Sequence, residues 1–281
     1  MTSPSTSGPA RAEIGVIGGS GFYEFLSDAE RVSVATPFGD PSDDLFLGEL
    51  HGRRVAFIAR HGHGHRFPPH RVNYRANLWA LRSVGVRQVL APCAVGSLRR
   101  ELGPGTVVVP DQVVDRTWGR EHTVYGEIGS AVHVGFADPY CPRGRAVISS
   151  TVRAAGLPLA ESGTLVVVNG PRFSSRAESE WHQAAGWSVV GMTGMPEASI
   201  ARELAMCFTT IAMVTDHDAG VDGEQGVTHE EVLEVFAKNI EGLKSALSTA
   251  IAAMPADEPD DTATCACRRA LDGVTLPFAL P

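Results

Sequence analysis

Short apolar runs rich in β-branched residues recur along this chain, and they constrain its fold more than any other feature. They are EIGVIG (13–18), RVAFIAR (54–60), QVLAPC (88–93), TVVVPDQVV (106–114), TLVVVNG (164–170), SVVGM (188–192) and CFTTIAMVTD (207–216). Most are continuous rather than alternating, which is typical of strands buried on both faces. We therefore expect a sheet that is covered on both sides.

Helical patterns lie between several of these runs, and we expect helices over 73–84, 143–155, 176–185, 196–205 and 228–252. Ser175 or Ser174 is expected to cap the third helix, with Glu178 completing a capping box. Thr228 and Glu231 are expected to form a capping box at the start of the last helix. Strands that alternate with helices predict an α/β fold, with a mixed, largely parallel twisted central sheet flanked by helices.

The organisation of the chain is expected to be simple. Its 281 residues fit one large α/β unit. We expect residues 1–11 to be a disordered leader and residues 12–252 to be a single catalytic domain. An acidic, proline-containing stretch follows at 254–264, and apolar residues then return. Residues 253–281 are therefore expected to form an extension that docks on the body or on a neighbouring subunit.

Composition narrows the function. The net charge of −8 argues against a general nucleic-acid binder, which usually presents a basic face. The sequence contains no run of 18 apolar residues, the length that would suggest a membrane span. The odd count of five cysteines and the polar N-terminus favour a reduced, cytoplasmic location. Cys265 and Cys267 form a Cys-x-Cys pair, which is either redox-active or simply two surface thiols.

The stretch ARHGHGHRFPPHRVNYRANLWAL (59–81) concentrates histidine and arginine, which suit either a metal or an anion. His61, His63 and His65 would share one face of a strand, but glycines and prolines interrupt it, and it contains no cysteine or carboxylate to complete a zinc site. Arg60 follows a buried run, where α/β sheets bind ligands, and can bind phosphate in a bidentate manner. His61 can donate another hydrogen bond, so an anion site is favoured over a metal or a plain loop.

The glycine-rich stretch GVIGGSGFY (15–23) follows the first apolar run. Glycine permits positive φ and lets backbone N–H groups converge on an anion, and Ser20 adds a hydroxyl group. The spacing matches neither the dinucleotide-binding pattern nor the P-loop. A phosphate cradle and a plain tight turn both remain open.

Side chains suited to an organic ligand follow the later runs. Phe173 can stack on a flat ligand, or belong only to a loop before a helix. Thr193 lies near an expected helix N-terminus, where anions are favoured, and Glu197 is interpreted as a partner of that helix dipole. Asp216 and Asp218 end a buried run, so they either exchange hydrogen bonds or a proton with a heterocycle or are surface charges.

The motifs together resemble a known family. IGVIGGSGFY, TPFGDPSD, ARHGHGH, HRVNYRANLWAL, GSL, VPDQVVDRTWGR, FADPYCP, GPRFSSRAE, GMTGMPEA and TDHDAG occur in that order between about residues 13 and 252. This series is similar to the 5′-methylthioadenosine phosphorylases of the trimeric purine nucleoside phosphorylase superfamily. The resemblance implies a cytoplasmic homotrimer that converts 5′-methylthioadenosine and phosphate to adenine and 5-methylthioribose 1-phosphate, with no metal or organic cofactor.

The resemblance also implies roles for individual residues. Phosphate contacts would come from Ser20, Arg60, His61, Cys93, Ala94 and Thr193. The nucleoside would contact Phe173, Met192, Asp216, Asp218, His133 and Phe278. His133 and Phe278 would face the 5′ group of a neighbouring subunit's substrate. Asp216 and His61 would be catalytic, and no residue would bind a metal.

Asp216 bears on the choice of base, because relatives acting on 6-oxopurines typically have asparagine there, whereas a carboxylate suits a 6-amino group. One departure from the family is Cys93, which stands where threonine is common. The alternatives are a phosphorylase of 6-oxopurine, 5′-deoxy or 5′-halo nucleosides, a non-catalytic nucleoside-binding protein and, third, a zinc-binding protein.

Overall fold

A computed structural model of the chain describes residues 12–19, 22, 26, 29–127, 131–221, 229–259 and 262–281. Its strands are β1 (Ile14–Gly18), β2 (Glu30–Val32), β3 (Leu45–Leu50), β4 (Arg53–Ala59), β5 (Gln88–Ser97), β6 (Val107–Val108), β7 (Gln112–Arg116), β8 (Leu159–Ala160), β9 (Thr164–Val168), β10 (Val189–Gly191) and β11 (Cys207–His217). Its α-helices are α1 (Tyr74–Ser83), α2 (Pro142–Ala154), α3 (Arg176–Ala184), α4 (Gly194–Glu203) and α5 (His229–Ala253).

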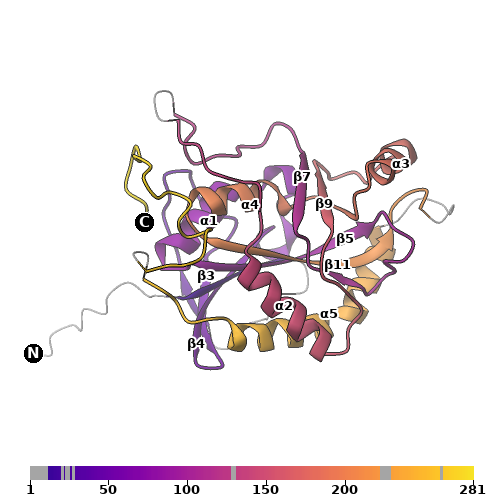
Figure 1. The fold of residues 1–281 in the computed structure, drawn as a ribbon, viewed down its shortest axis with the longest axis horizontal. Helices are drawn as coiled ribbons and strands as arrows, with labels where there is room; N and C mark the ends of the chain where they lie inside the picture. The colour runs from indigo at the N-terminus through magenta and orange to yellow at the C-terminus, as the bar shows by residue number, and fades with distance from the viewer. Residues whose placement is uncertain are drawn as a thin grey trace, which may run out of the picture.

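The strands form one mixed sheet at the centre of the molecule (Figure 1). Its order is β2-β3-β4-β1-β5-β10-β9-β7, with β11 beside β5 and β6, and β6 beside β8. Strands β4, β1, β5 and β11 are parallel neighbours, so their carboxyl ends meet at one edge. This arrangement confirms the expected fold class.

Helices cover the sheet on both faces. Helices α1 and α4 pack together on one side, and α2 packs against α5 on the other (Figure 1). Strand β4 shows how this arises: Val55, Phe57 and Ala59 join the core beneath α2 and α5. Ala56 and Ile58 point the other way, into the core beneath α1 and α4. Alternation along a strand thus turns one apolar run into part of two cores.

The helix predictions hold to within two residues at each end. The capping box at Ser175 and Glu178 is present at the start of α3. Thr228 lies outside the described residues. The predicted strand 106–114 is wrong, because it divides into β6 and β7 around Pro110, which has no N–H to give to a sheet. Strands β2, β3 and β8 were not predicted.

The C-terminal extension lies against the body. Phe278 packs with its ring centroid 5.7 Å from that of Trp79 and 5.2 Å from that of Tyr125. Cys265 and Cys267 are buried. The alternative of two surface thiols is therefore wrong, because each faces other cysteines instead of solvent. The division at residue 253 itself remains a prediction.

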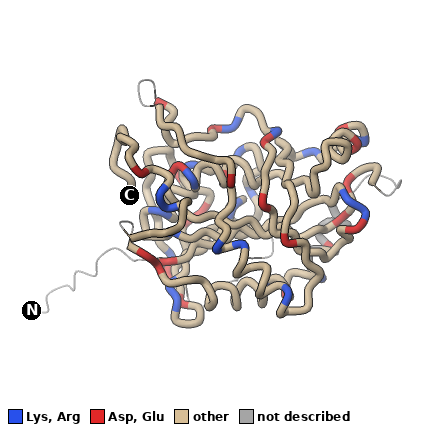
Figure 2. Tube along the Cα trace, viewed as in Figure 1, with Lys and Arg blue, Asp and Glu red and all other residues tan. Residues whose placement is uncertain are grey.

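The charged residues are spread over the trace, with acidic and basic positions interspersed (Figure 2). Among the helices of the described residues, none is both long and apolar enough to cross a membrane.

Candidate active site

A cavity of about 430 Å³ opens where β1, β4, β5 and β11 end. Its lining includes most of the site residues expected from the sequence: Arg60, His61, Cys93, Ala94, Phe173, Met192, Thr193, Asp216 and Asp218. Ser20 lies outside the described residues. His133 and Phe278 are not among the lining residues of the described chain, so their place beside a neighbouring subunit's substrate remains a prediction. This volume falls in the usual range for small-molecule sites.

Arg60 is the most constrained cation of the cavity, with 1% of its surface exposed. Its Nε donates to Glu197 Oε1 at 2.6 Å, and its Nη2 donates to Glu197 Oε2 at 3.1 Å. Its Nη1 donates to the Pro92 carbonyl at 3.0 Å. Three of the five N–H groups of the guanidinium are thus engaged, which leaves one on each terminal nitrogen for an anion.

Glu197 was missed as a functional residue, because its place in the first turn of a helix explains an acid without any partner. In the structure it is 1% exposed, and its carboxylate faces Arg60. Burial raises the pKa of Glu197, although the neighbouring Arg60 opposes that shift. The charge pair keeps Arg60 oriented, and removing either member leaves a buried charge without compensation.

His61 has a fixed tautomer. Its Nδ1 lies 2.8 Å from the Phe67 carbonyl, which can only accept, so Nδ1 carries the proton. Burial, together with the charge of Arg60, lowers the pKa of His61 to about 3. The ring is therefore neutral near pH 7, and its Nε2 is an acceptor. This geometry favours contact with the hydroxyl of a protonated phosphate, whereas the sequence analysis expected a donor.

A neutral His61 predicts a stability effect at acid pH. The unfolded chain binds a proton at His61 below about pH 6.5, but the folded protein does not until about pH 3. Wild type should therefore lose about 2 kcal/mol of unfolding free energy between pH 6.5 and about pH 5 through this group alone. Urea unfolding of wild type and His61→Gln over this range measures the difference. A constant difference would contradict the prediction.

Cys93 and Thr193 add neutral groups to the lining. Burial raises the pKa of Cys93 to about 12, so its thiol stays protonated and presents no negative charge to an anion. Thr193 is the N-cap residue of α4, and its hydroxyl makes no capping hydrogen bond to that helix. The backbone of Met195 and Pro196 is not helical, so the regular part of α4 begins after them, and Thr193 contributes its hydroxyl to the cavity rather than the N–H groups of a helix end.

Two carboxyl groups lie in the same cavity. Thr215 Oγ1 donates to Asp216 Oδ1 at 2.6 Å. Asp218 is 5% exposed, and burial raises its pKa. Within the described residues, Asp218 Oδ2 makes no hydrogen bond of good geometry, although the hydroxyls of Ser174 and Ser179 lie close enough to oppose the rise in the pKa of Asp218. A buried acceptor of this kind is costly unless a ligand donates to it. The surface-charge interpretation of Asp218 is therefore wrong.

Arg120 holds together segments of the cavity wall through hydrogen bonds to their carbonyls. Its role was not predicted from the sequence. Its Nη1 donates to the Met195 carbonyl at 2.6 Å, and its Nη2 donates to the carbonyls of Met192 at 2.8 Å and Asn169 at 2.9 Å. One buried guanidinium thus joins the segment that holds Met192 and Thr193 to the loop that leads to Phe173. The motif DRTWGR gave no sign of this, because its carbonyl partners are distant in sequence.

Arg120→Lys should therefore destabilise the protein although the charge is kept, because an ammonium cannot serve carbonyls on both segments. We expect a loss of about 3 kcal/mol of unfolding free energy, from unpaired buried carbonyls that cost about 1–3 kcal/mol each. Urea unfolding measures this loss. Arg116→Lys, at an exposed position on β7, is the control. Equal stability of the two variants would refute the role of Arg120.

Comparison with known proteins finds relatives that are phosphorylases of nucleosides. The model of the Phosphorylase superfamily matches residues 13–252. A purine nucleoside phosphorylase from Streptomyces coelicolor is 59% identical, over 96% of this chain and 98% of its own. An S-methyl-5′-thioadenosine phosphorylase from Mycolicibacterium smegmatis is 52% identical, over 95% and 99%.

Solved structures agree with these relatives. A methylthioadenosine phosphorylase from Schistosoma mansoni, in complex with adenine, superposes with a TM-score of 0.84 at 38% identity, covering 88% of this chain and 93% of its own. A methylthioadenosine phosphorylase from an antarctic soil metagenomic library gives a TM-score of 0.85 at 39% identity, covering 94% and 92%.

Proposed function

This chain belongs to the phosphorylase superfamily, and we propose on that premise that it cleaves 5′-methylthioadenosine with phosphate. The products are adenine and 5-methylthioribose 1-phosphate. The observation that supports this most is the pairing, in one cavity, of an oriented guanidinium with two carboxyl groups. The first suits the anion, and the second suits a base that carries an amino group.

The phosphate is expected beside Arg60, Thr193 and Cys93. Two N–H groups of Arg60 remain for its oxygens, and the neutral thiol of Cys93 does not repel them. The Nε2 of His61 accepts from the phosphate hydroxyl, so one phosphate oxygen keeps its proton and the others keep their charge. The expected contribution of Ser20 remains part of the proposal.

The base is expected beside Phe173, Asp216 and Asp218. The carboxyl group of Asp218, which lines the cavity, is proposed to accept from the exocyclic amine of adenine. Asp216, whose Oδ1 accepts from Thr215, is proposed to be protonated when the substrate is bound and to donate that proton to N7. Met192 lines the cavity between the loops and is proposed to contact the ribose.

Charge then determines the order of events. The glycosidic bond stretches first, and the ribose gains positive charge, which the clamped phosphate offsets. The departing base gains negative charge, which the proton from Asp216 neutralises. A phosphate oxygen finally bonds to C1′. Groups placed where charge develops in the transition state contribute most to the rate.

A 6-oxopurine phosphorylase is the second candidate, because the relative from Streptomyces coelicolor is named a purine nucleoside phosphorylase. The two carboxyl groups in the cavity favour an aminopurine over a 6-oxopurine. The 5′ substituent stays open, and 5′-deoxy or 5′-halo adenosines fit the same proposal. A non-catalytic nucleoside-binding protein is the alternative outside the enzymes.

We further propose that the enzyme acts as a homotrimer in the cytoplasm and needs no organic cofactor. His133 and Phe278 would then reach the 5′ group of a neighbouring subunit's substrate. Sedimentation of the purified protein gives the oligomeric state directly.

The first experiment is incubation with 5′-methylthioadenosine, with and without phosphate, and with inosine in parallel. The proposal requires free adenine only when phosphate is present, and little hypoxanthine from inosine. Adenine without phosphate would indicate a hydrolase, hypoxanthine alone would favour the second candidate, and no product would favour a binding protein.

A further inference from the structure

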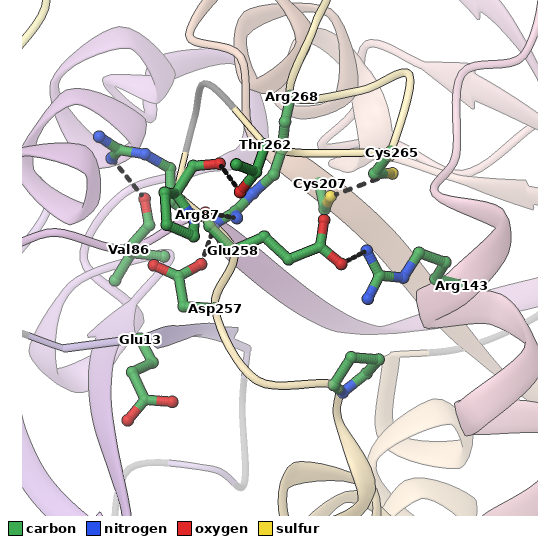
Figure 3. Close-up of polar contacts among 12 residues, drawn as sticks. Glu13, Val86, Arg87, Arg143, Cys207, Asp257, Glu258, Thr262, Cys265 and Arg268 are labelled. Carbon is green, nitrogen blue, oxygen red and sulfur yellow. Dashed lines mark hydrogen bonds and ion pairs between the residues drawn. The ribbon is translucent and has the colours of Figure 1, made fainter.

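Four of the five cysteines lie together, and none of the four lines the active-site cavity. Cys141 precedes α2, Cys207 begins β11, and Cys265 and Cys267 belong to the C-terminal extension. All four are buried, and their sulfur atoms lie within 4.8 Å of one another. A turn closed by the Arg268 N–H and the Cys265 carbonyl, 3.0 Å apart, brings the last two together. Figure 3 shows Cys265 facing Cys207.

We propose that these four cysteines bind one zinc ion that fastens the C-terminal extension to the body. Four thiolates at about 2.3 Å from a tetrahedral zinc ion lie about 3.8 Å from one another. The Cys265 sulfur is 3.7 Å from that of Cys141 and 3.5 Å from that of Cys207. These two separations match those between the ligands of a closed structural site, and the remaining sulfur atoms lie within 4.8 Å of one another.

The same distances disfavour two disulfide bonds. In a disulfide, two sulfur atoms lie about 2.05 Å apart, so each bonded cysteine has one partner that is much closer than any other cysteine. Here Cys265 has two neighbours at nearly equal distance, so the geometry singles out no pair. An iron–sulfur cluster places inorganic sulfide between its metals, and so it holds its cysteines farther apart than one ion does.

The surroundings suit a negatively charged thiolate site. Four thiolates and one Zn²⁺ carry two net negative charges. The Nη2 of Arg202 lies 3.8 Å from the Cys267 sulfur, and carbonyls of Gly135 and Asp138 fix this guanidinium at 2.8 and 2.6 Å. Cys141 stands at the N-terminus of α2, where a thiolate is favoured.

The polar contacts between the C-terminal extension and the body stabilise the docked extension less than a bound zinc ion would. Arg143 pairs with Glu258 at 3.0 Å, and Arg268 Nη1 donates to the Glu258 carbonyl at 2.7 Å (Figure 3). Arg143 and Glu258 are each about a third exposed, and ion pairs of this kind contribute about 1 kcal/mol or less. A zinc ion would instead join the segment before α2, the central strand and the extension at one point. This inference does not depend on the proposed function.

The test is the metal content of the full chain. The reduced protein, free of any histidine tag, is incubated with zinc sulfate, desalted and analysed by plasma mass spectrometry. We expect about one zinc per wild-type chain and at least a tenfold loss in the double variant Cys265→Ser, Cys267→Ser. Cys93→Ser is the matched control and should keep its zinc, since that cysteine lies in the other site.

Cobalt gives a second readout that does not depend on the folding of a variant. Wild type loaded with Co²⁺ should show intense thiolate-to-cobalt charge-transfer absorption and the visible bands of a tetrahedral ion. Wild type without bound zinc and without these bands would overturn the proposal. Protein purified without reductant gives a further test. An intact mass that indicates two disulfides, together with failure of that protein to take up zinc, would also overturn the proposal. Iron in place of zinc would overturn it as well.

Discussion

Arg60→Lys should lower kcat/KM for phosphate by about a hundredfold to a thousandfold, the usual effect of removing a group that stabilises transition-state charge. Arginine holds Glu197 with two nitrogens while keeping N–H groups for an anion. Lysine is a point charge and cannot serve both partners in that geometry. Initial rates at varied phosphate and saturating nucleoside measure the effect. Arg54→Lys, exposed on β4, is the control.

The variant Glu197→Gln tests the orientation of Arg60 separately from its charge. It keeps Arg60 but removes the carboxylate that orients it, and breaking a buried pair costs about 3–5 kcal/mol of stability. Because Glu197 only positions Arg60, we expect KM for phosphate to rise more than kcat falls, while KM for the nucleoside stays near wild type. If Arg60→Lys binds phosphate as wild type does, the proposed clamp is wrong.

Asp216→Asn should lower kcat/KM for 5′-methylthioadenosine by about a hundredfold to a thousandfold, through the loss of the proton supplied to the leaving base. The same change should spare or improve 6-oxopurine nucleosides, because an amide always has N–H groups to donate to a 6-oxo group, whereas a carboxyl group can donate only while it is protonated. Parallel assays with inosine and 5′-methylthioinosine measure this reversal of preference.

The control for this change is Asp115→Asn, which removes an exposed carboxylate on β7, outside the cavity. It should leave both activities near wild type. An equal fall for aminopurine and oxopurine substrates in Asp216→Asn would show that Asp216 does not read the base. The outcome also bears on which of the two names given to the relatives, purine nucleoside phosphorylase or S-methyl-5′-thioadenosine phosphorylase, describes the better substrate of this chain.

The strands of the core could be predicted because burial on both faces demands continuous apolar runs. Strands β1, β4, β5 and β11 all come from such runs, and residues within or just after their carboxyl-terminal parts line the cavity, among them Arg60, Cys93 and Asp216. Strand β3 was not predicted, since its sequence LFLGEL breaks that pattern with Gly48 and Glu49. Strands β6 and β8 have two residues each, too few to show a period.

Partners distant in sequence could not be predicted from local patterns. Arg60 and Glu197 are separated by 137 residues, yet one signal was available. Glu197 stands among apolar residues in GMPEASIA, and an acid that is buried requires a partner. No comparable signal connects Cys141 and Cys207 with the Cys-x-Cys pair, because only the packing of the extension brings them together.

The neighbouring strands of the sheet also act as a ruler. Arg60 follows β4 and Asp216 lies in β11, and the order β4, β1, β5, β11 places three intervals between these strands. At about 4.8 Å for each interval, the two strands lie about 14 Å apart. A backbone ladder sets this separation, and no loop can lengthen it. Differences in the choice of base between proteins that share this sheet can then come from side chains at its edge or on the loops beside it, such as Phe173, without a change in the spacing of these strands.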